Sequence, residues 1–335
     1  MQKVIIFFLL ATLMWSCQKK RTEINGTAQG TYYYISYFSD TGENLKHEID
    51  SILDTYNQSV STYEKNSVIN RFNRTHNSFS PDSIFLQNLR LSLRIARLTN
   101  GAFDPTVAPL VDAWGFGTEK ERNLDPTHLD SLKKLIGYQN IILNGKQVRK
   151  KNPRLKINFN AIAKGFSVDL IGDYLKSKGL NSYLVDIGGE VKTHGQKPGG
   201  DKWTVGIEKP ANEKDANRQV HTILEIENMA VATSGNYRQY YEKDGTKYSH
   251  TINPKTGKPV EHNLLSASVI TDLCGRADAF ATAFMVMGKD KTLEFVKQNP
   301  GLNLEVMLIY ADDDGKYQTA SSPGFKEYIK NKDRE

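Results

Sequence analysis

The sequence contains few cysteines, few prolines and no repeat or low-complexity tract. Two cysteines in 335 residues are too few for a disulfide framework, which excludes the small disulfide-stapled domains. Only 11 prolines and 25 glycines are present, which excludes collagen-like and Pro/Gly-rich disordered chains. What remains is a globular chain, 39% hydrophobic and 24% charged, that is long enough to bury a large core.

The charge balance also lacks a strong excess of either sign. The chain has 44 basic and 38 acidic residues, which gives a formal net charge of +6. No basic tract is longer than three residues, as in Lys19-Lys20-Arg21. A nucleic-acid partner is therefore not expected, because such proteins gather basic residues into a patch or stripe.

One apolar run stands at the N-terminus and indicates an export signal. Lys3 precedes a ten-residue apolar run from Val4 to Leu13. This run is too short to span a bilayer but has the length of the hydrophobic region of a signal peptide. We interpret residues 1–16 as a signal peptide.

The signal ends in a segment that resembles a bacterial lipobox. The small residue Ser16 precedes Cys17, so cleavage between them would leave an acylated cysteine at the mature N-terminus. We therefore expect an exported lipoprotein, anchored to a bacterial membrane through Cys17 and facing the periplasm. Residues 17–24 would form the tether and residues 25–335 one folded domain. The alternative is an ordinary signal peptide in which Cys17 is incidental.

Helix and strand patterns are mixed along the remaining chain without regular βαβ alternation. Strand patterns are found at residues 32–38, 183–187, 203–208, 222–226, 265–271 and 304–310, and at 237–242 and 247–252 around the hairpin signal Asp244-Gly245. Helix patterns are found at 45–56, at 161–178 and at 276–287. Two more helices are expected where Ser80-Pro81 and Asp125-Pro126 each supply a cap followed by a first-turn proline. We expect an α+β fold, a single domain with mixed, mostly antiparallel sheets packed against helices.

Two segments combine small residues with one charge. Between Gly101 and Pro109, two prolines fix an irregular loop around Asp104, which is either part of a site or a structural loop capped by this carboxylate. A helix starts near Ala161, and its free N–H groups and dipole favour a bound anion. Lys164 adds a full positive charge there; the alternative is a solvated surface lysine.

Two later segments carry groups that suit phosphate chemistry. His250 ends an expected strand, where it is able to act as a base or to serve as a hydrogen-bonded structural group. Asp278 and Thr282 are four residues apart on an expected helix, so their oxygens share one face and can bind a hard cation. Alternatively, Asp278 only complements the helix N-terminus.

Taken in order, these segments resemble the ApbE family of FAD:protein FMN transferases. The motifs that match are Gly30-Thr31-Tyr32, Ser61-Thr62-Tyr63-Glu64, Gly101-Ala102-Phe103-Asp104-Pro105-Thr106, Ala161-Ile162-Ala163-Lys164-Gly165, Val185-Asp186-Ile187-Gly188-Gly189-Glu190, Ala232-Thr233-Ser234-Gly235, Ser249-His250-Thr251-Ile252-Asn253-Pro254 and Ala277-Asp278-Ala279. The resemblance implies an exported, Mg²⁺-dependent enzyme that cleaves FAD, releases AMP and attaches FMN through a phosphoester to a Thr or Ser of an acceptor protein.

The resemblance also implies roles for single residues. Asp278, the Thr282 hydroxyl and the Ala161 carbonyl would hold Mg²⁺, while Lys164 would meet the phosphates. His250 would assist removal of the proton from the acceptor hydroxyl, so that His250 and Asp278 are the expected catalytic residues. The residues expected to contact FAD are Gln29, Ser61, Thr62, Tyr63, Asp104, Lys164, Thr233, Ser234, His250 and Ile252. Gln29 stands where members of the family usually have methionine.

Three functions fit this set of residues. The first is flavinylation of membrane-bound or periplasmic redox subunits. The second is Mg²⁺-dependent hydrolysis of FAD to FMN and AMP, with water in place of the acceptor hydroxyl. The third is FAD storage or delivery without chemistry, which would leave Asp278 and Thr282 without a role.

Overall fold

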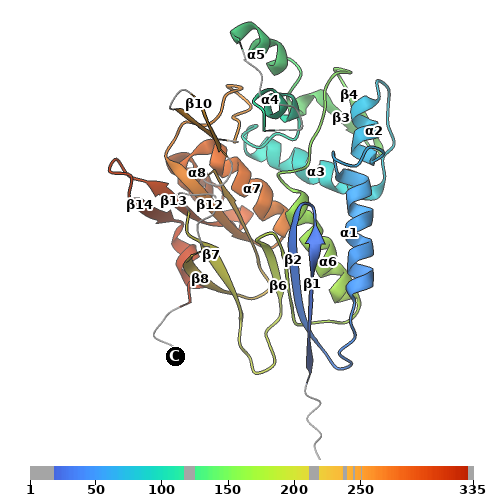
Figure 1. Ribbon diagram of the computed structural model, residues 1–335, viewed down its shortest axis with the longest axis vertical. Helices are drawn as coiled ribbons and strands as arrows, with labels where there is room; N and C mark the ends of the chain where they lie inside the picture. Colours follow the sequence, from blue (N-terminus) through green and yellow to red (C-terminus); the bar gives the residue numbers. More distant parts are fainter. Residues whose placement is uncertain are drawn as a thin grey trace, which may run out of the picture.

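The structure is a computed structural model that describes residues 19–116, 125–210, 219–236, 240–243, 246–249 and 251–330. Its centre is one eight-stranded sheet in which every neighbouring pair is antiparallel (Figure 1). In spatial order the strands are β1 (Lys20–Ala28), β2 (Thr31–Ser39), β5 (Tyr183–Ile187), β6 (Glu190–His194), β9 (Ala230–Gly235), β12 (Leu264–Thr271), β13 (Glu305–Ala311) and β14 (Tyr317–Ser321). This arrangement confirms the expected α+β class with antiparallel pairing.

Three separate hairpins accompany the central sheet. They are formed by β3 (Ile141–Asn144) with β4 (Gln147–Lys150), β7 (Trp203–Glu208) with β8 (Val220–Ile226), and β10 (Tyr240–Lys243) with β11 (Thr246–Ser249). The last of these confirms the hairpin expected around residues 244–245.

The helices lie mainly on one face of the central sheet and in a lobe above it (Figure 1). They are α1 (Lys46–Val60), α2 (Val68–Arg74), α3 (Ser83–Leu98), α4 (Ala108–Ala113), α5 (Pro126–Lys133), α6 (Ala163–Ser177), α7 (Cys274–Met287) and α8 (Lys289–Gln298), with short 3₁₀ turns η1 (Tyr138–Asn140), η2 (Pro300–Leu302) and η3 (Pro323–Tyr328). None of the helices that the structure describes combines the length and the hydropathy of a transmembrane span.

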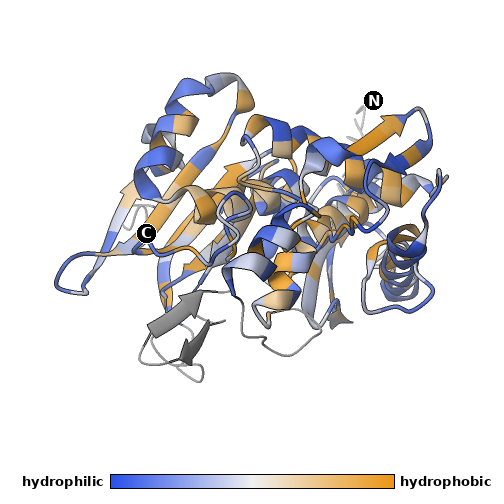
Figure 2. Ribbon diagram, turned by 90° about the horizontal axis from the view of Figure 1, so that it is seen from above, coloured by the Kyte–Doolittle hydropathy of each residue, from blue (hydrophilic) through white to orange (hydrophobic). Residues whose placement is uncertain are grey.

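The alternation of side chains along the strands explains this layering. Ile35 and Val185 are fully buried on the face that packs against α6. Leu184 and Ile270 point the other way and pack with the β7–β8 hairpin and η3. Both faces of the sheet are therefore covered, and hydrophobic residues gather along the strands while hydrophilic residues mark the periphery (Figure 2).

Two boundaries differ from the expectations. Residues 20–24, expected in the tether, belong to β1, where Lys20 pairs with Ser39 and Ile24 is 2% exposed. Residues 20–24 are thus part of the sheet and not of a tether, because this polar edge strand is stabilised by pairing with β2 rather than by its own apolar pattern. The expected signal peptide and Cys17 lie outside the described residues.

Helix α3 begins at Ser83 and not directly after Ser80-Pro81. The reason is that the Asp82 carboxylate accepts the N–H of Phe85 at 2.8 Å and so caps the helix two residues later. In α5, by contrast, Asp125 caps the helix and Pro126 is its first residue, as expected.

Candidate active site

The site is built where the N-terminal turns of α6 and α7 touch. Each helix has a glycine at the contact, Gly165 on α6 and Gly275 on α7. A Cβ atom on Gly165 would lie 2.4 Å from the carbonyl oxygen of Cys274, and one on Gly275 would lie 3.3 Å from the backbone of Phe166. The two backbones approach so closely that the side chains of one helix reach the free N–H groups of the other.

Asp278 uses this contact to cap α6. Its carboxylate comes from α7, is 4% exposed, and accepts the backbone N–H of Gly165 at 3.0 Å through Oδ2. Its other oxygen, Oδ1, accepts no hydrogen bond from the described residues. Asp278 therefore caps the neighbouring helix α6 rather than complementing the N-terminus of its own helix, and it still has a carboxylate oxygen to offer a ligand.

The Ala161 carbonyl is left open by the same hydrogen bond. In a regular helix the N–H of Gly165 would donate to the carbonyl four residues earlier, which is that of Ala161. Here it donates to Asp278, and within the described part of the chain no backbone N–H donates to the Ala161 oxygen. The Ala161 carbonyl and Asp278 are thus brought to the same helix terminus.

Asn73, at the end of α2, fixes the segment that precedes Ala161 through two hydrogen bonds. The Asn73 side chain donates to the Ile157 carbonyl at 2.9 Å and accepts the Ile157 N–H at 2.8 Å. One residue later, the N–H of Asn158 donates to the carbonyl of Pro105 at 2.8 Å. The loop before α6 is therefore fixed at two consecutive residues.

Thr282 lies one turn after Asp278 on α7 and is partly exposed. Its hydroxyl is 3.3 Å from that of Ser234 on β9, a long contact that leaves the Thr282 oxygen available. The neighbouring Thr233 hydroxyl is 2.8 Å from Ser268 on β12. Thr233 therefore joins two strands of the sheet, whereas Ser234 meets the site.

This set of oxygens fits a hard divalent cation. A carboxylate, a hydroxyl and a backbone carbonyl are the ligands that Mg²⁺ prefers, with water or phosphate oxygens completing its coordination. The described residues contain no group of three His, Cys, Asp or Glu side chains placed to hold a metal ion. A cation at this terminus would therefore depend on Asp278, Thr282 and Ala161 together with oxygens of the substrate.

Lys164 lies beside this set and forms an ion pair with Glu190. Its Nζ is 2.5 Å from Oε1 of Glu190, which begins β6. Burial alone would lower the pKa of Lys164, but the carboxylates of Glu190 and Asp278 outweigh it and raise this pKa above its ordinary value. Lys164 is therefore a permanent cation at the start of α6 and not a solvated surface lysine.

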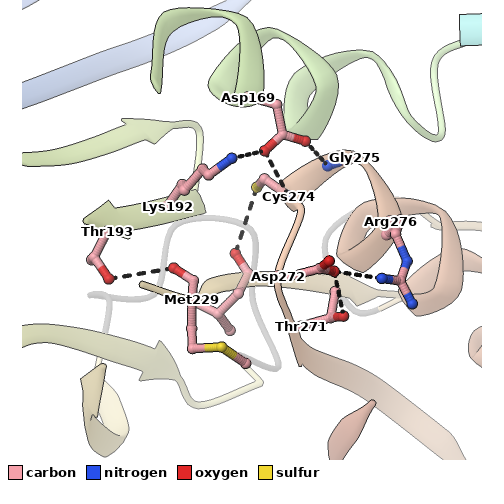
Figure 3. A network of polar contacts seen from close by, with 10 residues as sticks. Asp169, Lys192, Thr193, Met229, Thr271, Asp272, Cys274, Gly275 and Arg276 are labelled. Carbon is pink, nitrogen blue, oxygen red and sulfur yellow. Dashed lines mark hydrogen bonds and ion pairs between the residues drawn. The ribbon is translucent and has the colours of Figure 1, made fainter. Parts of the chain in front are cut away.

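A second ion pair joins the same two elements in the opposite sense. Asp169 on α6 lies 2.7 Å from Nζ of Lys192 on β6, and it also accepts the N–H groups of Cys274 at 3.0 Å and Gly275 at 2.9 Å (Figure 3). Asp169 therefore caps α7. Cys274 is fully buried there, and burial raises the pKa of its thiol, so this cysteine is an inert packing residue.

Gln29 reaches the same helix from the turn between β1 and β2. Its backbone φ is +53°, and its side-chain amide donates to the Ser167 hydroxyl at 2.9 Å. Ser167 in turn donates to the Lys164 carbonyl at 2.8 Å. The structure thus brings Gln29 to the first turns of α6, and its Oε1 is buried without a hydrogen-bond partner among the described residues.

The expected FAD contacts at residues 61–63 form the loop after α1. Asn70 on α2 donates from its side chain to the carbonyls of Thr62 and Glu64, both at 2.9 Å. The N–H of Tyr63 donates to the Ser61 hydroxyl at 3.2 Å. Tyr63 is 73% exposed, so this loop presents a large unburied aromatic residue.

Asp104 is used within its own loop. One oxygen accepts the Thr106 N–H at 2.8 Å and hydroxyl at 2.6 Å, and the other accepts the Tyr138 N–H at 3.0 Å. Burial raises the pKa of this carboxyl despite these hydrogen bonds. The structure thus shows contacts for the structural role of Asp104, in which its carboxylate caps the loop. An FAD contact by Asp104 stays a prediction.

Ile252 belongs to a small separate core. It is 5% exposed and packs with Leu110 and Ile136 in a cluster that ties the 251–260 turn to α4 and α5. Trp114 strengthens this link by donating its indole N–H to the carbonyl of Gly257 at 2.8 Å. His250 lies outside the described residues, so its expected catalytic role and FAD contact stay predictions.

Three residues that hold the site residues in position were not predicted from the sequence. Glu190, Asp169 and Asn73 are not marked by any local pattern, although Glu190 closes the Gly188-Gly189 motif that contributed to the resemblance. The available signal was an acidic residue directly after two consecutive glycines, which mark a tight turn.

Comparison with known proteins agrees with this geometry. The ApbE family model matches residues 29–308. The chain is similar to FAD:protein FMN transferases of Vibrio cholerae serotype O1, with 37% identity over 328 residues (95% of this chain, 96% of the relative), and of Escherichia coli strain K12, with 34% identity over 320 residues (92% and 89%).

Solved structures give the same result. The flavin transferase ApbE from Vibrio cholerae has a TM-score of 0.82 and 34% identity, covering 92% of this chain and 99% of that one. The apo flavinyl transferase ApbE of Pseudomonas stutzeri has a TM-score of 0.83 and 33% identity, covering 93% and 98%. The similarity spans nearly the whole described domain, and the chain therefore belongs to the ApbE family.

Proposed function

We propose that this protein transfers FMN from FAD to a Thr or Ser hydroxyl of an acceptor protein in a Mg²⁺-dependent reaction. The observation that supports it most directly is the pairing of an open Ala161 carbonyl with the Asp278 carboxylate at the start of α6. The Thr282 hydroxyl on the next turn of α7 adds a third hard oxygen. Family membership supports the same activity, since the similar proteins above carry this name.

The reaction exchanges one bond to phosphorus for another. The acceptor hydroxyl oxygen bonds to the FMN phosphorus, the bond between this phosphorus and the bridging oxygen of the diphosphate breaks, and AMP leaves with that oxygen. The hydroxyl proton must also leave, and His250 is the residue we propose to receive it. A loose transition state needs little proton removal before the bond to AMP breaks, so positioning and charge stabilisation matter most.

The described residues would provide that positioning. The Lys164 ammonium would bind the diphosphate oxygens, because it carries a full positive charge at the start of α6. Asp278, Thr282 and the Ala161 carbonyl would hold the Mg²⁺ ion, which supplies neutralisation of phosphate charge when bound. Gln29, Ser61, Thr62, Tyr63, Asp104, Thr233, Ser234 and Ile252 are the remaining proposed FAD contacts.

We also propose the setting in which this reaction occurs. Export, lipid anchoring at Cys17 and a periplasm-facing position would bring the site to redox subunits at a bacterial membrane. Strand β1 starts at Lys20, close in sequence to Cys17, so an anchored chain would hold the sheet near the membrane. The acceptor would therefore be another protein at the same membrane surface.

The experiment is to incubate the mature protein with FAD, Mg²⁺ and a candidate acceptor. Transfer predicts flavin fluorescence that stays with the denatured acceptor, together with a mass gain equal to FMN. Asp278→Ala should abolish labelling, while Asp173→Ala, which removes an exposed carboxylate on α6, should not. AMP release without labelled protein from any acceptor would favour hydrolysis, and FAD binding with neither product would favour storage.

A further inference from the structure

Glu190 is a buried carboxylate for which the proposed reaction has no assigned role. It is 3% exposed and comes from the start of β6, directly after the turn Gly188-Gly189. The backbone φ angles of these two glycines are +65° and +100°, and Asp186 accepts the Gly189 N–H at 2.8 Å, so the turn is firmly set. The position of the Glu190 side chain is thus fixed by the sheet.

The two side chains of the Lys164–Glu190 ion pair differ in their exposure to solvent. The Glu190 side chain is 4% exposed, while that of Lys164 is 32% exposed. The carboxylate therefore holds the ammonium from the protein interior, and the other N–H groups of Lys164 remain available on the open side. Its second oxygen, Oε2, has no hydrogen-bond partner among the described residues, so Lys164 is the one group shown to hold this carboxylate.

Lys164 has a second carboxylate within reach of its charge. Asp278 accepts the N–H of Gly165, the residue next to Lys164, and its charge also acts on the lysine. After Glu190, Asp278 is the carboxylate whose charge acts most strongly on the ammonium, so it is the counter-charge left when Glu190 is removed. A lysine paired with Asp278 would compete directly with a divalent cation for that carboxylate.

We propose that Glu190 is a positioning residue that holds the Lys164 ammonium away from Asp278 and so leaves the Asp278 carboxylate free to bind a divalent cation. This inference rests on the proposed function, because it assigns Asp278 to the cation. It also explains how a lysine and a divalent cation coexist at one helix terminus, since Glu190 balances the charge of the lysine before the cation and the diphosphate arrive.

The test measures cation binding rather than turnover. Mn²⁺ is titrated into the mature protein at pH 8.5 under argon, and free Mn²⁺ is followed by electron paramagnetic resonance. Glu190→Gln should raise the Mn²⁺ dissociation constant about tenfold. The double variant Lys164→Met/Glu190→Gln should recover an affinity within about threefold of the wild type, because no ammonium is left to compete.

The matched control comes from the other ion pair between α6 and β6. Lys192→Met breaks the Asp169–Lys192 pair, so it should lower thermal stability without changing Mn²⁺ affinity. Wild-type affinity in Glu190→Gln, or no recovery in the double variant, would overturn the proposal. If Glu190→Gln does not fold, Lys164→Met alone decides: it should bind Mn²⁺ at least as tightly as the wild type, and weaker binding would contradict the role.

One further variant separates this proposal from the function on which it rests. Asp278→Ala should lose Mn²⁺ binding. If Asp278→Ala binds Mn²⁺ like the wild type, the cation site itself is wrong, and with it the assigned function of Asp278. If Asp278→Ala loses binding while Glu190→Gln keeps it, the cation site stands and only the positioning role of Glu190 fails.

Discussion

Asp169 and Asp278 cap each other's helices. Asp169 lies on α6 and accepts the first N–H groups of α7, whereas Asp278 lies on α7 and accepts the N–H of Gly165 in α6 (Figure 3 shows the Asp169 half). Each carboxylate thereby neutralises the positive end of the neighbouring helix. This exchange ties the stability of the fold to the residue that is proposed to bind the cation.

Loss of the Asp169 cap should destabilise the whole protein. Asp169→Ala removes two hydrogen bonds to α7 and leaves Lys192, whose side chain is 12% exposed, without its partner. Breaking a buried pair in this way costs about 3 kcal/mol or more. Urea unfolding would measure the loss, with the exposed Asp173→Ala as control; equal stability of the two variants would show that the cap is dispensable.

The glycine contact between the helices should not tolerate a methyl group on α6. In Gly165→Ala the new Cβ would lie 2.4 Å from the Cys274 carbonyl oxygen and 2.8 Å from Cβ of Asp278, so the helices must separate. We expect a loss of about 2–4 kcal/mol. Gly172→Ala is the control on the same helix, because the atoms nearest to its new Cβ would be side-chain atoms of Tyr183 and Lys192 at 3.3 Å or more, with no backbone atom as close as in Gly165→Ala.

Thermal melts of both glycine variants decide this point. The expected order of stability is wild type, then Gly172→Ala close below it, then Gly165→Ala well below both. A Gly165→Ala protein that melts with the wild type would mean that the two helices are not in close contact.

The Asn73 clamp should affect use of the cation more than binding of FAD. Asn73→Ala removes both hydrogen bonds to Ile157 and loosens the loop that presents the Ala161 carbonyl. We expect the Mg²⁺ concentration that gives half-maximal FMN transfer to rise about tenfold. The free energy of the two lost hydrogen bonds would be divided between weaker Mg²⁺ binding and lower stability of the loop. Asn77→Ala, at an exposed position nearby, is the control. An unchanged Mg²⁺ requirement in Asn73→Ala would separate the clamp from the site.

Glu190 should give the stability of the fold a measurable pH dependence. Burial raises the pKa of Glu190 above its ordinary value of 4.5; Lys164 opposes this shift, and the charges of Asp278 and Asp186 add to it. Below this raised pKa the folded chain keeps a proton that the unfolded chain releases near pH 4.5, and above it Glu190 is the carboxylate that pairs with Lys164. The contribution of Glu190 to stability is therefore fully present below pH 4.5 and is lost as pH rises through the raised pKa, by up to ~1.4 kcal/mol per unit.

Unfolding free energies at pH 5, 6, 7 and 8 test this sign. Lys164 is charged in both states over this range and adds no slope. The stability of Glu190→Gln relative to the wild type should therefore improve as pH rises. A difference between the two proteins that is independent of pH would show that Glu190 ionises normally in the fold.

Much of the fold and the central residues of the site could be predicted from the sequence. The spacing of Asp278 and Thr282 placed both oxygens on one face of a helix, and α7 confirms that helix. Strand β1 was not predicted, because the segment from Lys20 to Ala28 is polar and buries only Ile24. Its pairing with β2 depends on hydrogen bonds that no side-chain pattern reveals.

The supporting residues of the site could not be predicted, for a related reason. Lys164 and Glu190 are distant in sequence and meet only because α6 packs against β6. Likewise, the opening of the Ala161 carbonyl follows from a hydrogen bond between two helices. Such relationships depend on tertiary packing, which a single sequence does not specify locally.

The most direct test of the account is to locate the cation. A crystal of the mature protein grown with FAD and Mn²⁺ would show the metal by its anomalous scattering. We predict a single peak at a contact distance of about 2.1 Å from the Asp278 carboxylate, the Thr282 hydroxyl and the Ala161 carbonyl, beside the FAD diphosphate. A peak bound elsewhere, with these three oxygens unliganded, would contradict it.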